Sequence, residues 1–472
     1  MRGRLAVLAL LALLAAGCGS SEAGTKSGAG DASSLVPSTA LGYIAANTDF
    51  GAGPLKSAEA ILDKFPIKPK VLMELKASLQ KQGIDADALA SSIGPETDIA
   101  ILRVNHETGA VAYTQPTDEK TFDAQLDKGQ SPAVHTVIDG WTVFSDKQAF
   151  LDAVTNRKAN LADDASYQAA KKTIPALGDA IATAYASPLG IAAGTMAANA
   201  SIPTGTTFGL GQGSAWATAA VTSSDDAFKL ELHAKSTTTS PAAAPTTSAL
   251  AASIPSGSIV ALSLTRGAGT IPANVRSQVK AVSGTLGFDL AGLLDGLNGP
   301  VIAYVRPGLP IPEVTIAGRA PHPKRAAAAI GLLIRRLTQN QYKPVPTPVD
   351  GGTLLKVDLG SLAIYYGAPG GKVVATDSAN ALAELNGSVG KLSGDAVFKE
   401  AKEGAAMPDA NEGFLFVNLK DAVPAVEGFA QLANQTVPQS VMENLKPLRS
   451  LLIYGSRDGD LQSLVVYVKT NP

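Results

Sequence analysis

Two short patterns hold the side chains best suited to covalent chemistry. Ser78-Leu-Gln-Lys81 and Ser277-Gln-Val-Lys280 both fit S-x-x-K, in which a lysine lies one helical turn from a serine that can form an acyl-enzyme. That chemistry also needs partner motifs of the S-D-N and K-T-G type, and neither occurs in the sequence. Both patterns fall in segments with amphipathic helical periodicity. We therefore interpret these side chains as solvated and keep a serine hydrolase using Ser78 as an alternative.

The spacing of glycines and histidines gives little indication of a phosphate-binding loop or a metal site. The segment GLGQGS at 209–214 lacks the lysine of a P-loop and precedes a strand rather than a helix, so we predict a turn there. No H-E-x-x-H motif occurs, and the histidines are widely spaced; they are His106, His135, His233 and His322. We expect surface or edge histidines, with no catalytic set, metal site or cofactor.

Two pairs of adjacent acids are predicted to stabilise the backbone rather than to bind calcium. Asp163-Asp164 stands at a helix start and Asp225-Asp226 at a turn between strands, where aspartate accepts hydrogen bonds from backbone N–H groups. Calcium takes roughly six to eight oxygen ligands, more than either pair offers.

The only cysteine of the 472 residues, Cys18, follows a three-part N-terminal segment. Arg2 and Arg4 give it a positive start, residues 5–16 are an unbroken apolar run, and Gly17 supplies a small residue before the cysteine. This order is typical of a secretory signal peptide with cleavage between Gly17 and Cys18. The apolar run is too short for a transmembrane helix, which needs about 20 residues.

The residues around Cys18 also resemble the lipobox of bacterial lipoproteins. The segment LAAGC at 14–18 places small residues directly before the cysteine, although the leucine usual three positions before it is Ala15 here, with Leu14 one step further back. The resemblance implies cleavage before Cys18, diacylglycerol on its thiol and attachment to the extracytoplasmic face of a membrane. Two or three acyl chains hold a protein stably, at about 0.8 kcal/mol per buried CH₂.

Composition agrees with a folded protein that does not bind nucleic acid. Hydrophobic residues make up 45% and charged residues 17% of the chain. The formal charge is −2, and removal of Arg2 and Arg4 with the leader lowers it by two, to −4, with no basic stripe for phosphates. Aromatic residues are 5%, which disfavours a carbohydrate platform, and we predict that Trp141 and Trp216 pack in strands of the core.

Low-complexity stretches divide the chain into five segments. We predict a lipoprotein signal peptide at 1–17, a flexible Gly/Ser tether at 18–34, a first domain at 35–236, a Thr/Pro/Ala linker at 237–249 and a second domain at 250–472. The tether would span about 20–24 Å on average.

The two long segments share four patterns in the same order, which predicts a tandem duplication with a period of about 200 residues. Both also close on a hairpin, with predicted turns at Ser223–Asp226 and Arg457–Asp460. The matched stretches are LVPSTALGYIAANTD (35–49) with SIPSGSIVALSLTR (253–266), LASSIGPETDIAILRV (89–104) with LLDGLNGPVIAYVRP (293–307), DASYQAAKKTIPALGDAIATAYAS (164–187) with DAVFKEAKEGAAMPDANEGFLFVN (395–418), and hairpins 216–235 with 450–469.

Local patterns within each copy mix strands with amphipathic helices. Asp139-Gly140 suits a two-residue type I′ turn, which predicts a hairpin over 133–146. Helices are predicted over 70–83, with one apolar face and a stop at Gly83, and over 323–337. The apolar face would hold Val71, Leu72, Leu75 and Leu79. We expect α+β domains, each a mostly antiparallel or mixed sheet with helices on one face.

Four segments of the first copy are similar to the bacterial domain of unknown function 3352 family. They are LVPSTALGYIAANTD (35–49), KFP (64–66), VIDGWTVFSDKQAFLDAV (137–154) and YQAAKKTIPALGDAIATAYAS (167–187). The second copy is similar more loosely, so that the resemblance covers most of residues 34–470. It implies a bacterial envelope or secreted protein, and it assigns no catalytic residue because the family has no assigned reaction.

These patterns favour a membrane-tethered extracytoplasmic lipoprotein with a non-catalytic binding or structural role in the cell envelope. Its expected partners are the membrane, through the lipid on Cys18, and an envelope protein or a small apolar ligand. A solute- or lipid-binding receptor that uses the cleft between its two domains is an alternative, since paired domains can close on a ligand.

Overall fold

The structure is a computed structural model that describes residues 31–81, 83–128, 133–195, 214–237, 249–265, 299–308, 311–360, 362–432 and 435–471. The chain divides into two compact units, 1–199 with 209–240 and 470–472, and 200–208 with 241–469. Both units combine helices with antiparallel strands, which confirms the predicted α+β class. The predicted signal peptide and most of the predicted linker lie outside the described residues.

The first unit alternates its strands with short helices. Its elements are η2 (Ala32–Ser34), β1 (Gly42–Asn47), α2 (Gly53–Leu62), α3 (Lys68–Gln80), α4 (Ala86–Ser92), β2 (Glu96–Val104), β3 (Glu107–Thr114), α5 (Glu119–Asp127), β4 (Val134–Ile138), β5 (Trp141–Ser145), α6 (Gln148–Thr155), η3 (Leu161–Asp163), α7 (Ala165–Lys171), η4 (Leu177–Asp179), β6 (Ala182–Ala186), α8 (Pro188–Thr195), β7 (Ser214–Ser224) and β8 (Ala227–Ser236).

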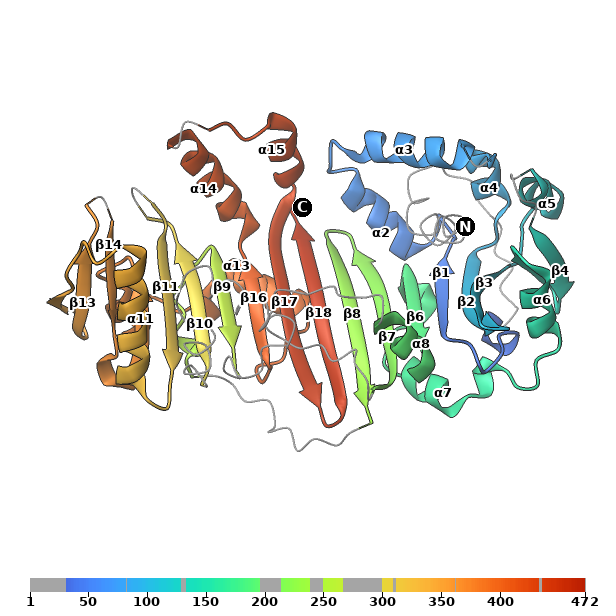
Figure 1. Ribbon diagram of the computed structural model, residues 1–472. Coiled ribbons are helices and arrows are strands. Elements are labelled where there is room, and N and C mark those ends of the chain that lie inside the picture. The colour runs from blue at the N-terminus through green and yellow to red at the C-terminus, as the bar shows by residue number, and fades with distance from the viewer. Residues whose placement is uncertain are drawn as a thin grey trace. The chain divides into compact units, whose positions relative to one another are not determined.

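The sheet of the first unit is antiparallel in every pairing between its described strands, in the order β4-β5-β3-β2-β1-β6-β7-β8 (Figure 1). The first strand of the unit, β1, therefore lies inside the sheet, where Gly42 pairs with Ile101 on one side and Ala186 on the other. The predicted hairpin is confirmed, because Asp139 and Gly140 have φ of 51° and 82° between β4 and β5.

Helices cover both faces of this sheet, so the prediction of a single covered face is wrong for this unit. Phe122 of α5 packs edge-on against Phe144 of β5, and Leu79 of α3 joins the same cluster. On the opposite face, the Tyr167 ring of α7 lies 5.9 Å from the ring of Tyr43. The physical reason lies in the sequence of β2, whose side chains are buried on both faces of the strand and therefore need cover on both sides of the sheet.

The helix predicted over 70–83 is α3, and its apolar face differs from the prediction. Leu79 is fully buried and Leu75 packs beside it, but the side chain of Val71 is 36% exposed. Leu72 is partly buried and borders an open hollow on the helix surface. Because it stands seven residues before Leu79, it lies on the same side of α3, so the apolar face packs on the core at Leu75 and Leu79 and reaches the surface at Leu72 and Val71.

The second unit follows the same alternation of strands and helices. Its elements are η5 (Ala251–Ser253), β9 (Val260–Leu264), β10 (Val301–Arg306), β11 (Glu313–Arg319), α11 (Pro323–Leu337), β12 (Val345–Val349), β13 (Gly352–Asp358), β14 (Ala363–Gly367), η7 (Pro369–Gly371), β15 (Lys372–Thr376), α12 (Ala381–Asn386), η8 (Leu392–Gly394), α13 (Ala396–Gly404), β16 (Gly413–Val417), α14 (Leu419–Leu432), α15 (Gln439–Leu445), β17 (Leu448–Asp458) and β18 (Leu461–Thr470).

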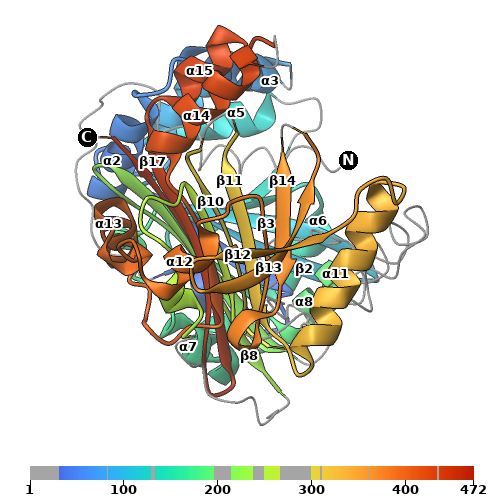
Figure 2. The same cartoon turned by 90° about the vertical axis from the view of Figure 1, so that its left-hand side faces the viewer.

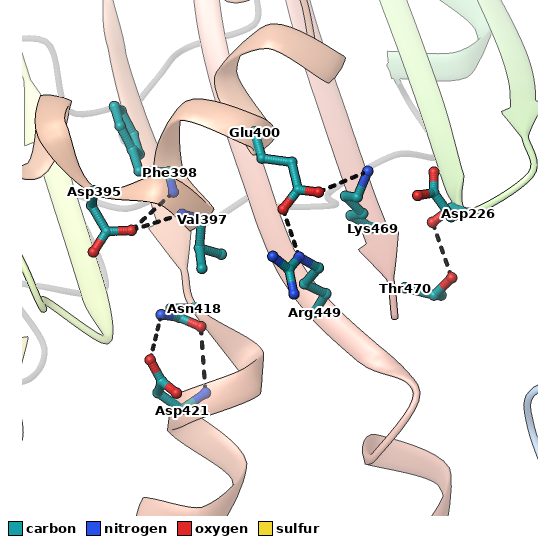
Figure 3. A network of polar contacts seen from close by, with 10 residues as sticks. All are labelled: Asp226, Asp395, Val397, Phe398, Glu400, Asn418, Asp421, Arg449, Lys469 and Thr470. Carbon is teal, nitrogen blue, oxygen red and sulfur yellow. Dashed lines mark hydrogen bonds and ion pairs between the residues drawn. The ribbon is translucent and has the colours of Figure 1, made fainter. Parts of the chain in front are cut away.

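The sheet of the second unit runs in the order β12-β13-β14-β15-β11-β10-β9-β16-β17, again antiparallel in each of these pairings. Helix α11 has the predicted bounds and lies along β14 and β15 (Figure 2), with Ala326 against Val373 and Ile334 against Tyr366. Helix α13 is joined to the strands by Glu400, whose carboxylate accepts from Arg449 at 2.6 Å and from Lys469 at 3.2 Å (Figure 3).

The two units share a strand order and a register around their first strands. The order β5-β3-β2-β1-β6-β7 in the first matches β15-β11-β10-β9-β16-β17 in the second. Gly42, the first residue of β1, pairs with Ile101 of the neighbouring strand β2. Val260, the first residue of β9, pairs in the same way with Val305 of the neighbouring strand β10. Each unit also has an isolated antiparallel β-bridge that involves a proline, between Pro37 and Asn160 in the first and between Pro255 and Lys391 in the second.

The first described residues fall inside the segment predicted as a flexible tether. Asp31 caps η2 by accepting a hydrogen bond from the Ser33 N–H at 2.7 Å, and Ala32 and Ser33 are buried. The tether prediction is therefore wrong for residues 31–34. The Gly/Ser composition carried no periodic signal for these residues, which a single capping carboxylate and burial against the domain hold in place.

Within the described ranges, no helix combines the length and the apolar character that crossing a bilayer demands.

Candidate functional site

Several residues singled out by the sequence fall where the structure gives no description. Cys18 and Gly17 lie outside the described residues, as do Ser277, Lys280 and residues 209–213. The lipidation and cleavage predictions therefore stay predictions. On α3, Ser78 is exposed, and Lys81 directly after the helix is exposed too, which confirms the interpretation of this S-x-x-K pattern as a solvated helix end.

The four histidines lie on separate elements. His106 forms the β2–β3 turn together with Asn105, both with positive φ, and His135 on β4 has its Nε2 3.9 Å from Asp123 Oδ1. Burial lowers the pKa of His233 on β8, and His322 precedes α11. Among the side chains that the structure describes, no group of three or more His, Cys, Asp or Glu residues is placed to hold a metal ion.

The acidic pairs and the tryptophans take the structural roles that were predicted. Asp164 accepts a hydrogen bond from the Tyr167 N–H at 2.9 Å and caps α7. Asp225 and Asp226 form the turn between β7 and β8. Both tryptophans are buried, Trp141 at the start of β5 and Trp216 on β7.

A buried polar group in the first unit was missed by the sequence analysis. It joins residues from η2, β1, β2 and α7, and we call it the acid–tyrosine cluster. Its members are Asp31, Tyr43, Glu96, Asp98, Tyr167 and Lys171.

Hydrogen bonds link the acid–tyrosine cluster from the buried strand to the surface. The Tyr43 hydroxyl donates to Asp98 Oδ2 at 2.6 Å, and its oxygen lies 3.2 Å from Asp31 Oδ1. The other oxygen of Asp31 is paired with Lys171, which is more than half exposed. Glu96 lies two residues before Asp98 on the same side of β2, and the two carboxyl groups are within hydrogen-bonding reach.

Burial and mutual repulsion set the charge of these acids. Asp98 is 0% exposed, and no described group donates to its Oδ1. Burial raises the pKa of Asp98 well above its usual range, and the negative charge of Glu96 adds to the rise. Burial and the charge of Asp31 likewise raise the pKa of Glu96. Burial opposes ionisation of Asp31, but hydrogen bonds from Lys171 and Ser33 outweigh it and lower its pKa.

The second unit has mostly apolar side chains at the corresponding place in its fold, with the hydroxyls of Ser263 and Tyr304 on the same face of its sheet. By the shared register, Ala261 of the second unit corresponds to Tyr43 of the first, and Ile302 corresponds to Asp98. Asp164 and Asp395 cap corresponding helices, so Tyr167 and Phe398, each three residues after its cap, also correspond to each other. The N-cap of η5 that corresponds to Asp31 is Leu250, and all four counterparts are buried. The fold itself therefore does not require the polar group.

A second feature of the first unit is an apolar surface on α3, which we call the α3 outer face. Met73 is 65% exposed and Leu72 lies beside it, and the face borders an open hollow. Lys76 is the charged side chain on this face and is paired with Asp87 at 2.8 Å. The residues of the face are Pro69, Leu72, Met73, Lys76, Ala77 and Gln80.

Comparisons with known proteins give no assignment. No protein-family model matches the chain, and no curated protein matches it. Among solved structures, crystal form IV of TP0453 is 13% identical with a TM-score of 0.26, over 45% of this chain and 76% of that one. Crystal form III of TP0453 is 12% identical with a TM-score of 0.26, over 49% of this chain and 94% of that one. At such TM-scores these likenesses carry no argument.

Proposed function

We propose that this chain is a lipid-anchored extracytoplasmic protein with a non-catalytic binding role in the bacterial cell envelope. The support for the anchor lies in the first 18 residues, where two arginines, a 12-residue apolar run and Gly17 precede the only cysteine. The resemblance of LAAGC to a lipobox, and of the first copy to the domain of unknown function 3352 family, points the same way. Acylation would use the only thiol and hold the mature chain at the membrane.

The proposal includes a tandem duplication of one α+β domain. Its support is the common strand order of the two units, the matching register of β1 with β9, and the proline bridges at Pro37 and Pro255. Two domains of this size each bury their own core, so one copy can carry a site while the other keeps the fold. The polar cluster of the first unit and its mostly apolar counterpart in the second are a difference of this kind.

The observation that carries the binding role is the α3 outer face. Soluble proteins leave single apolar side chains exposed, but apolar residues gathered around a hollow are typical of binding surfaces. Met73 and Ala77 are one helical turn apart on this face, and Leu72 lies at its border with the core-facing Leu79. Met73 is 65% exposed and therefore contributes little to holding α3 on its domain. We propose that the face receives a small apolar ligand.

Native mass spectrometry of the full mature protein, purified from the producing bacterium in lipid nanodiscs, tests this role. We expect a retained apolar ligand, and we expect Leu72→Ser with Met73→Ser to lower its occupancy by roughly tenfold or more. Each buried side chain of this kind is worth about 1.5–3 kcal/mol, and about 1.4 kcal/mol is a factor of ten.

The matched control is Leu332→Ser with Leu337→Ser on α11, two leucines that are also exposed at the surface of a helix. This variant should keep the ligand. A wild-type protein without ligand, or equal occupancy in both variants, would contradict the proposed site. A protein that is retained in place of a small molecule, and lost only from the α3 variant, would show that the partner class is wrong.

A further inference from the structure

We propose that the acid–tyrosine cluster is a proton-controlled latch for Asp31–Leu35, the first turn that the structure describes. One proton held between the carboxyl groups of Glu96 and Asp98 keeps Asp31–Leu35 docked on the first unit, and loss of that proton to water weakens the docking. The latch rests on the described contacts of the first unit. Only its position next to a membrane tether depends on the proposed function.

Asp31 makes the charged contacts of the docked turn. Its carboxylate caps η2 through Ser33, approaches the Tyr43 hydroxyl and pairs with Lys171. Leu35 is 2% exposed, and the Val36 carbonyl accepts a hydrogen bond from Leu161 at 2.7 Å. The segment is therefore buried, and the charge that surrounds Asp31 decides how firmly it is bound.

Carboxylates outnumber cations around Asp98. Glu96 on β2 and Asp31 before η2 are acidic, and Lys171 of α7 is the cation paired with Asp31. The other titratable groups facing Asp98 are phenols that stay neutral, Tyr43 of β1, Tyr113 of β3 and Tyr167 of α7, because burial raises the pKa of each. The positive charge of Arg157, which follows α6, opposes the rise in the pKa of Tyr113.

A shared proton accounts for the oxygen of Asp98 that has no donor. Asp98 Oδ1 is fully buried, and the nearby Glu96 carboxylate can accept a hydrogen bond but has none to donate unless one of the two groups is protonated. A single proton between the two carboxyl groups satisfies both oxygens. When that proton passes to water, two negative charges, one fully and one partly buried, remain close to each other and to Asp31, whose docking they oppose.

The direction of the pH effect follows from the raised pKa values of Glu96 and Asp98. A carboxyl group whose pKa is higher in the folded than in the unfolded state favours folding below its unfolded pKa, and that contribution is lost as pH rises through the folded pKa. Docking of Asp31–Leu35 is thus strongest in mild acid and weakens as pH rises. Asp31 acts in the opposite direction, because its pKa is lowered, and its contribution is lost only in stronger acid.

The second unit supplies an internal comparison. Leu250, Ala261, Ile302 and Phe398 occupy the corresponding places. The polar contacts of its first turn include those of Lys391, which donates to the Ser253 carbonyl, and of Asp395, which accepts from the Gly257 N–H, and the described contacts there include no pair of adjacent carboxyl groups. The equivalent backbone hydrogen bond, from Leu392 to the Ile254 carbonyl, measures 2.8 Å. Docking in the second unit should therefore not depend on a carboxyl proton.

Hydrogen exchange of the full mature protein, measured between pH 5 and pH 9 and corrected for intrinsic rates, tests the latch. We expect the protection of the Leu35 and Leu161 amides to fall by about tenfold as pH rises, the change that one pKa unit of difference between docked and open states produces. The Leu392 amide of the second unit is the control and should keep its protection. Asp98→Asn should flatten the pH dependence at Leu35.

A second variant guards against misfolding of Asp98→Asn. Exchanging the cluster for its counterparts, as Asp31→Leu, Tyr43→Ala, Asp98→Ile and Tyr167→Phe together with Ala100→Tyr, should keep the turn docked at every pH. Ala100→Tyr is included because Tyr304 pairs with Ala261 in the second unit, as Ala100 pairs with Tyr43 in the first. Protection at Leu35 that does not vary with pH in the wild type would overturn the latch, and so would an unchanged pH dependence in the fivefold variant. Neither outcome depends on Cys18, so either can be told apart from failure of the anchor proposal.

Discussion

At the scale of single residues, the side chains whose types and spacing suggested chemistry are not the ones that the structure brings together. Ser78 and the histidines have the reactive side chains, but the structure places them on exposed helix ends, turns and separate strands. Asp98 and Tyr43 were passed over because 55 positions separate them and no spacing rule joins them. One local signal existed, since Glu96 and Asp98 lie two residues apart on one side of β2, directly before the apolar run Ile99–Leu102.

Gly109 provides a residue-scale prediction about the face of the sheet covered by α6. A Cβ at this position would lie 2.3 Å from ring atoms of Phe150, which is buried. Gly109→Ala should therefore destabilise the first unit by about 1–3 kcal/mol through overpacking. That loss corresponds to a fall of roughly 2–12 °C in the melting temperature for a domain of this size, measured by calorimetry.

Gly178→Ala is the control for this substitution, because a Cβ at Gly178 meets nothing within 4 Å. Its melting temperature should match that of the wild type. An equal melting temperature for Gly109→Ala and wild type would contradict the packing of Phe150 over β3.

At the scale of elements, local rules predicted well wherever a few neighbouring residues decide the structure. Asp139-Gly140 gave the hairpin turn, and Pro323 with its following apolar period gave α11. The rules failed where burial depends on distant elements. Val71 is exposed although it belongs to the apolar period of α3, and both faces of the first sheet are covered, because periodicity records an apolar face but not what packs on it.

The caps of α7 and α13 yield a prediction about corresponding elements in the two units. Asp164 accepts a hydrogen bond from one backbone N–H of α7 at 2.9 Å, and Asp395 accepts from two of α13, at 2.9 and 3.1 Å, besides the Gly257 N–H at 3.4 Å. Alanine at either position should lower the free energy of opening of its helix by about 1 kcal/mol. Hydrogen exchange of the amides in each helix measures this loss.

Asp163→Ala separates capping from a general effect of charge. Asp163 is the exposed neighbour of Asp164, and its loss should change the opening of α7 by less than about 0.5 kcal/mol. Equal effects of Asp163→Ala and Asp164→Ala would show that the hydrogen bond to Tyr167 does not stabilise α7.

At the scale of the whole chain, four matched sequence patterns predicted a tandem duplication, which stays a prediction, and the central strands of the two units have a common order. The sequence could not predict that order, because β1 and β9 each begin a unit yet pair on both sides with strands far along the chain. Nor could it predict that β12, β13 and β14 extend the second sheet beyond β15. Such pairings are decided by long-range packing rather than by local pattern.

The proposed role depends above all on lipid attached to Cys18. A chain held at a membrane by acyl groups presents its two units outside the cytoplasm, where a binding surface on α3 and a latch on Asp31–Leu35 have a purpose. Without that attachment, the same units would be secreted or would remain in the cytoplasm, and the proposed envelope role would have no basis.

The most direct test is the mass of the N-terminal peptide of the protein extracted from membranes of its native host. We predict a peptide that begins at Cys18 and carries the added mass of a diacylglycerol group, with or without a further acyl chain on its amine. In a Cys18→Ser variant this added mass should be absent and the protein should leave the membrane fraction. A native peptide with an unmodified Cys18 thiol, or one still joined to residues 1–17, would contradict the account.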